Sequence, residues 1–146
     1  MGKINLGRVI LGGIVAGIVA DIIDFLVDDV WLAGRWTTAM SKLGQPASFS
    51  AGQLICAYAL GIIGGLVAVW IYAAMRPRFG AGVKTAVYAG LAVWVLGTVL
   101  PNIGFMLVLF PIHFFGRRLT LYTTLGGLVE VVVGTIAGAA LYKEAD

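Results

Sequence analysis

Four long apolar runs constrain this chain more than any other feature of its sequence. They cover residues 9–32, 51–75, 85–110 and 119–142. A helix needs about 20 apolar residues to cross a hydrocarbon core of about 30 Å, and each run is long enough. The runs are continuous, whereas strands of membrane barrels alternate in polarity over about ten residues. The sequence therefore predicts an all-α membrane protein, a bundle of four transmembrane helices with short loops.

Composition supports this fold class. Only 12% of the 146 residues are charged and 60% are hydrophobic, whereas about a quarter of a soluble domain is charged. The first run could belong to a cleaved signal peptide, but it continues past Ala20 and would place bulky Ile18 at position −3 of the cleavage site. We therefore expect it to remain as the first helix. Residues 1–146 are predicted to form a single transmembrane domain.

The longest predicted connection, residues 33–50, contains a helical pattern of its own. Trp36, Met40 and Leu43 follow one another at steps of four and three residues, which places them on one face of a helix. Such a segment beside a membrane-spanning helix is typical of a short interfacial helix. Gly44 and the proline after it should end that helix.

Basic residues at the ends of the runs predict the orientation in the membrane. Four crossings place both termini on one side, which collects Lys3, Arg8, Arg76, Arg78, Lys84 and Lys143. The opposite side has Arg35, Lys42, Arg117 and Arg118. The six-to-four excess favours cytoplasmic termini under the positive-inside rule. Basic residues at these positions act as topology signals, so we predict no nucleic-acid binding.

Glycines recur at helical spacing in three of the four runs. The chain has 21 glycines, and three pairs stand four residues apart: Gly13 with Gly17, Gly61 with Gly65, and Gly134 with Gly138. Small residues at this spacing let helix backbones approach closely. The pattern predicts a compact bundle in which the first and fourth helices pack through Gly13, Gly17, Gly134 and Gly138.

Acidic residues continue the glycine stripes. Asp21 and Asp24 lie on the glycine face of the first helix, and Glu130 lies four residues before Gly134 on the fourth. At about 1.5 Å per residue, Asp21, Glu130 and Asn102 fall at one depth, with Asp24 about one turn nearer the far surface. A charge at the bilayer centre costs at least about 2.5–3.5 kcal/mol. We therefore predict that these four residues form a buried polar layer.

Three interpretations of this layer remain open, because no Lys or Arg lies at its depth. The carboxylates could be neutral and join helices by hydrogen bonds, they could bind a proton or cation, or they could contact a partner subunit. Desolvation favours the neutral form of a buried acid, so we predict that Glu130 is neutral at pH 7 and hydrogen-bonded to Asp21 or Asn102. Asp28 and Asp29 should be interfacial and solvated.

Catalytic and metal-binding patterns are missing from the sequence. It contains no GxSxG, HExxH or phosphate-binding loop, and its single cysteine, Cys56, excludes a disulfide framework and a CxxC pair. His113, the only histidine, falls in a loop, where an ordinary interfacial role is expected rather than ligation. We therefore predict no enzyme activity, no cofactor and no metal.

Three stretches are similar to those of a group of small bacterial four-span membrane proteins of unknown function. They are GGIVAGIVADIIDF, YAAMRPRFGAGVKTA with the AGLAVW that follows, and LGGLVEVVVGTIAGAALY. The resemblance covers most of the chain, and RPRFG-G-KTA is its most specific part. It implies a location in the bacterial inner membrane and implies no activity.

The function expected from these features is non-enzymatic. A chain with almost no extramembrane surface is expected to act by association in the lipid bilayer, as a homo-oligomer or as an accessory subunit of a larger membrane complex. The alternative is a small proton- or cation-coupled transporter that uses the polar layer. An aqueous path to the acids would favour the transporter, and a dry hydrogen-bonded layer would favour the subunit.

Overall fold

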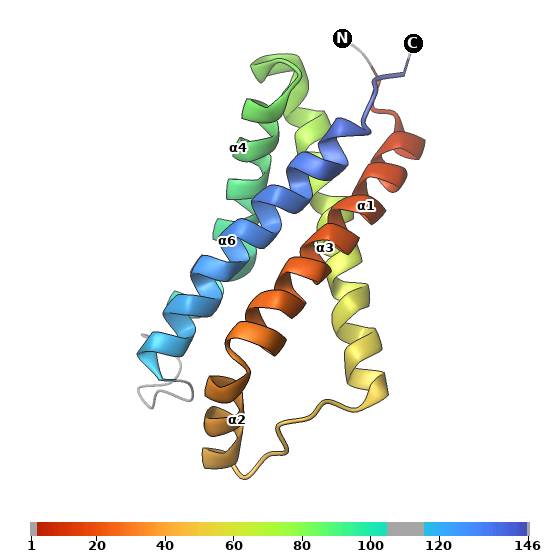
Figure 1. Cartoon of the computed structure of the whole chain (residues 1–146). Coiled ribbons are helices and arrows are strands. Elements are labelled where there is room, and N and C mark those ends of the chain that lie inside the picture. The colour runs from red at the N-terminus through yellow and green to blue at the C-terminus, as the bar shows by residue number, and fades with distance from the viewer. Residues whose placement is uncertain (1–2, 105–115, 146) are drawn as a thin grey trace.

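The computed structural model describes residues 3–104 and 116–145 of the chain. Its helices are α1 (Leu6–Asp24), η1 (Phe25–Trp31), α2 (Ala33–Lys42), α3 (Ala51–Phe79), α4 (Val83–Trp94), η2 (Val95–Val99), α5 (Leu100–Gly104) and α6 (Arg117–Ala140). The η segments are π-helical continuations, so α1–η1 and α4–η2–α5 each form one continuous rod. The two described termini meet at one end of the bundle, which we call the terminal end, and α2 lies at the opposite, far end (Figure 1).

These two rods and the helices α3 and α6, which we also call rods, are long and apolar enough to cross a membrane. They span Leu6–Trp31, Ala51–Phe79, Val83–Gly104 and Arg117–Ala140. The predicted four-helix membrane bundle is therefore confirmed. Residues 105–110, which the sequence also assigned to the third helix, lie outside the described part.

Local signals at the helix ends explain where the spans begin and end. Asn5 caps α1 by accepting a hydrogen bond from the Arg8 N–H, and Ser50 forms a reciprocal capping box with Gln53 at the start of α3. The second span runs four residues further than predicted because Pro77 is tolerated in its last turn. It ends at Gly80, whose φ of 83° is accessible to glycine without strain.

The four rods form a ring in which α1 packs against α3 and α6, while α4 packs against α6 and α3 (Figure 1). The main core lies toward the terminal end and consists mostly of alanines, with Val69 and two tyrosines, Tyr72 and Tyr142. These rings pack edge to face, with centroids 5.9 Å apart. Small core residues bring the helix axes close, which is how helices associate where lipid removes the hydrophobic effect.

The glycines lie at these helix contacts, but with a partner the sequence did not predict. A Cβ built on Gly17 would lie 2.5 Å from the Cα of Ile62 on α3, so Gly17 faces α3. Gly13 faces the same helix, and Gly65 lies against both glycines. On α6, Gly134 contacts the Ala16 carbonyl of α1.

The predicted pairing of the glycines on the first and fourth helices is therefore wrong in its partner. The two helices do pack together, and α6 uses its glycine face, with Gly138 lying against Gly12 and Ala16 of α1. The prediction used only the fact that Gly13 and Gly17 lie on one face of the first helix. A four-residue spacing shows that this face packs closely, but it does not show whether the neighbour is α3 or α6.

Two π-helical segments interrupt the α-helical winding near the polar residues. In η1, the Leu32 N–H donates to the Val27 carbonyl five residues earlier, at 2.8 Å. Segment η2 ends two residues before Pro101, whose ring leaves the carbonyl four residues upstream without its α-helical donor. A π-helical turn often accommodates a missing backbone hydrogen bond of this kind, and such turns are frequent at functional positions.

The bundle is tight at the terminal end and open at the far end. The first ten residues of α3, 51–60, are exposed except for half-buried Leu54. A Cβ on Gly52 or Gly64 would meet no atom within 4 Å. Figure 1 shows this half of α3 (yellow) diverging from the other helices. The far half of α3 therefore lacks the neighbours that its terminal half has.

The short helix predicted between the first two spans is present as α2, and it is anchored to the far end of the bundle. Leu32, Ala39 and Leu119 form a small buried cluster beneath it. The Arg35 guanidinium also lies 5.0 Å from the centroid of the Tyr122 ring on α6. Helix α2 is therefore held against the start of α6, with its polar side outward.

Candidate functional site: an acidic groove

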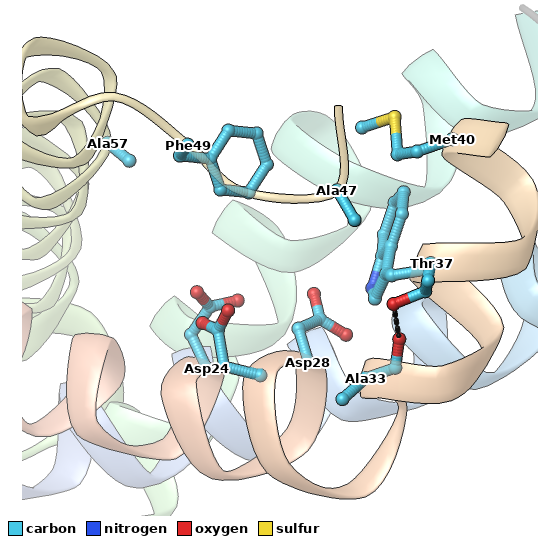
Figure 2. A pocket seen from close by; sticks show the side chains of 10 residues that line it. Asp24, Asp28, Ala33, Thr37, Met40, Ala47, Phe49 and Ala57 are labelled. Atoms are coloured by element: carbon cyan, nitrogen blue, oxygen red, sulfur yellow. Dashed lines mark hydrogen bonds between the residues drawn. The ribbon is translucent and has the colours of Figure 1, made fainter. Parts of the chain in front are cut away.

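The aspartates of the first rod line an open groove at the far end. Asp24, Asp28 and Asp29 border a cavity of ≈430 Å³ between η1, α2 and the segment before α3. Figure 2 shows the Asp24 and Asp28 side chains directed into this space, with Phe49 and Ala47 across from them. An adjoining pocket of ≈180 Å³ also contains Asp24 and Asp29. We call the two pockets together the acidic groove.

The opposite wall of the acidic groove is the exposed half of α3. Gln53 and Ala57, one helical turn apart, line the smaller pocket, together with Tyr58. One turn further along, Gly61 receives the Asp21 carboxylate, which occupies the space where a Cβ would lie. The groove thus has carboxylates on one side and small or polar residues on the other.

The deeper acid, Glu130, lies next to a pocket of ≈40 Å³ where α1, α3 and α6 meet. Small residues from α1 and α3, including Ala20 and Gly64, line it with Glu130 and Thr135. Asp24, Asp28 and Asp21 are close enough to Glu130 for their charges to interact. Asp21 and Glu130 approach the same part of α3, since Gly61, which the Asp21 carboxylate touches, lines the pocket beside Glu130.

Asn102 differs from the other members of the predicted layer. Its Nδ2 donates to the Thr124 hydroxyl on α6 at 2.8 Å, and that hydroxyl donates to the Thr120 carbonyl at 2.6 Å. Trp94 also donates from Nε1 to the Thr124 carbonyl, at 2.9 Å. Asn102 therefore belongs to a polar contact between the third rod and α6.

Two sequence predictions about the acids need correction. Among the described residues, no hydrogen bond joins Glu130 to Asp21 or Asn102, so that predicted bond is wrong: the Asn102 amide is directed to Thr124 instead. Asp28 was expected to be solvated, but its Oδ1 is buried, and its carboxylate interacts with the Trp36 indole. The docking of α2 over η1 covers Asp28, and Asp29 alone is exposed as predicted.

Several groove residues were not predicted from the sequence. Phe49 and Ala47 come from the segment between α2 and α3, and Gln53 lies in the first turn of α3, where it also forms the capping box with Ser50. Trp36 had been noted only for its helical spacing. One feature of the sequence could have indicated the role of Trp36. Helix α2 follows the acidic helix directly, so a turn between them can place Trp36 over the aspartates.

Electrostatically, the groove is a region of negative charge without a base. The ion pair of Arg76 with Glu144, whose N and O atoms lie 3.7 Å apart, is at the terminal end. Within the described residues, no cluster of three or more acidic, histidine or cysteine side chains is arranged to hold a metal ion. His113 lies outside these residues. The groove can therefore attract a cationic group, with Trp36 and Phe49 as apolar contacts.

Comparisons with protein-family models, with curated proteins and with solved structures find no match to this chain.

Proposed function

We propose that this chain is a non-enzymatic membrane protein that acts by association, as a homo-oligomer or an accessory subunit of a larger membrane complex. Its site of action would be the bacterial inner membrane, with both termini in the cytoplasm. The observation that carries the proposal is the open far end, where a helix without neighbours stands beside carboxylates within a membrane span.

The physical argument rests on what would otherwise fill the acidic groove. Asp24 lies within the first span, and the groove beside it opens toward the exposed half of α3. Lipid chains in that opening would contact carboxylates, which is costly when the acids are charged. A protein segment lying across residues 51–60 would separate the acids from lipid. It would also supply the helix contacts that α3 lacks there.

A cysteine scan along α3 tests this association. In a Cys56→Ser background, single cysteines are placed at positions 51 to 58, labelled with benzophenone maleimide in native membranes and irradiated, so that the label can insert into C–H bonds of any neighbouring protein. We expect a cross-linked product whose yield repeats every three to four residues, because one face of the helix would meet the partner. Cysteines at Leu121 and Leu125, exposed positions on α6, provide the matched control. Uniformly absent cross-linking along α3 would contradict the proposal.

A second candidate function, proton or cation coupling, is favoured by one specific observation. Asp24 lines the cavity of ≈430 Å³ at the far end, and Glu130 lines a separate pocket of ≈40 Å³ between α1, α3 and α6. Acids thus line pockets both at the far end and deeper in the bundle. For a transporter, Glu130 would have to exchange protons or bind the cation.

The protonation of Glu130 separates the two functions. On the association proposal, we expect Glu130 to be neutral at pH 7, because burial disfavours its charged form and no base lies at its depth. The infrared carbonyl band of a neutral carboxylic acid should then be lost in Glu130→Gln, while the variant keeps its fold. Glu144→Gln, at the exposed terminal end, should leave the band unchanged. An ionised Glu130, or a band that shifts on cation addition, would favour the transporter.

A further inference from the structure

We infer that the partner which covers the exposed half of α3 is a transmembrane helix of another protein that carries a lysine or arginine at the depth of Asp24. This inference rests on the association proposed above and specifies the chemistry of the partner. The docking surface consists of residues 51–60 of α3 together with the acidic groove beside them. Three properties of this surface support the assignment.

The first property is its charge. Asp24 and Asp29 line both pockets of the groove, Asp28 lines the larger one, and Asp21 contacts α3 just above them. The Oδ1 of Asp28 is buried, and its carboxylate interacts with the Trp36 indole. A cationic side chain entering the groove would offset the cost of holding these charges away from bulk water. Charge complementarity therefore selects a basic partner.

The second property is the shape of the α3 wall. Gln53, Ala57 and Gly61 repeat at four-residue steps and face the acids. Small residues on this face leave a pocket of ≈180 Å³, which is open rather than filled by the helix itself. A partner helix lying along the outer side of α3 could therefore insert one long side chain between α3 and η1. The Gln53 side-chain oxygen already accepts the Ser50 N–H at 2.8 Å, so it does not block the pocket.

The third property excludes a second copy of this chain as the source of the base. Asp24 precedes Trp31, the end of the first span, by seven residues, or roughly 10 Å at about 1.5 Å per residue. Within the four spans, basic residues occur only in the terminal turns, at Arg8, Arg76, Arg78, Lys84, Arg117 and Arg118. A symmetric dimer through this face would also set the acids of one copy against those of the other.

A designed peptide tests the inference on the full-length protein in liposomes. The probe is a transmembrane helix of leucine and alanine with one lysine seven residues from its end. Its controls carry glutamine or leucine at that position. Binding is followed by energy transfer between a dye on the peptide and a dye on a cysteine at Lys143 in the Cys56→Ser background. We expect the lysine peptide to bind at least tenfold more tightly than either control.

Substitutions in the protein assign the effect to the groove. Asp24→Asn should weaken binding of the lysine peptide about tenfold, whereas Glu144→Gln, which removes one acid at the terminal end, should not. Asp29→Asn, at an exposed position, repeats the test if Asp24→Asn does not fold. The reversed pair, Asp24→Lys with a glutamate peptide, should restore binding.

The outcomes of this experiment are distinct from those of the association test. Equal binding of the lysine, glutamine and leucine peptides would overturn the basic partner, even if the cysteine scan shows periodic cross-linking. Cross-linking to a second copy of this chain through residues 51–60 would also overturn it, since that copy has no base at this depth. Failure of the proposed association itself would appear as a cysteine scan without any product.

Discussion

Gly17→Leu is expected to destabilise the bundle by about 1–3 kcal/mol or more, because the contact between α1 and α3 has no space for a side chain. Even a Cβ on Gly17 would lie 2.5 Å from the Cα of Ile62 and 2.9 Å from the Gly61 carbonyl oxygen. Both are backbone atoms, so relief requires the helices to separate. Unfolding in mixed detergent micelles, followed by circular dichroism, would measure the loss.

The matched control is Gly52→Leu, which makes the same substitution in a membrane-spanning helix but at the open far end of α3, outside the contact with α1. No atom lies within 4 Å of a Cβ at Gly52, so the same change in size should have little effect on stability. Equal destabilisation by both substitutions would mean that the loss reflects leucine in place of glycine generally. Equal stability of both variants would contradict the close contact between α1 and α3.

Leu32→Ala is expected to release α2 from the far end. Leu32 is 1% exposed and lies in the small cluster with Ala39 and Leu119 that anchors α2. Truncating a buried leucine of this kind costs about 2–5 kcal/mol in protein cores. Hydrogen exchange of the α2 amides should therefore become faster, while exchange in the terminal half of α1 stays unchanged. Leu43→Ala, at an exposed position just past α2, is the control. Unchanged protection of α2 in Leu32→Ala would show that this cluster does not hold it.

The fold could be predicted from the sequence because the bilayer restricts the choice of structures so strongly. Run length and continuity identified four helices, and the spacing of Trp36 and Met40 identified α2. The spacing of Gly13 and Gly17 correctly indicated close packing. It could not identify α3 as the partner, because residues on one face of a helix can meet either of two neighbours.

The candidate site was predictable only in part, because sequence gives the depth of a residue along its helix but not the direction of its side chain. Depth along a straight helix placed Asp21, Asp24 and Glu130 together, since each depends only on distance from its own span end. The direction of the Asn102 amide depended on the π-helical turn before Pro101, which changes the rotation of everything after it. The groove itself required α3 to diverge and α2 to fold back over η1, and neither leaves a local pattern.

The position of α1 between α3 and α6 has a consequence for biogenesis. Helix α1 is synthesised before α3 and can meet it early, but its other neighbour, α6, follows all the other described helices in the chain. The contacts of Asn5 with the Tyr142 hydroxyl and of Lys3 with Ala145 close the bundle only after that. Until then, the Ala16 and Ala20 face of α1 remains uncovered in the membrane. The bundle is therefore closed only when α6 reaches α1, and a chain stalled before α6 would expose this face of α1 to chaperones and proteases.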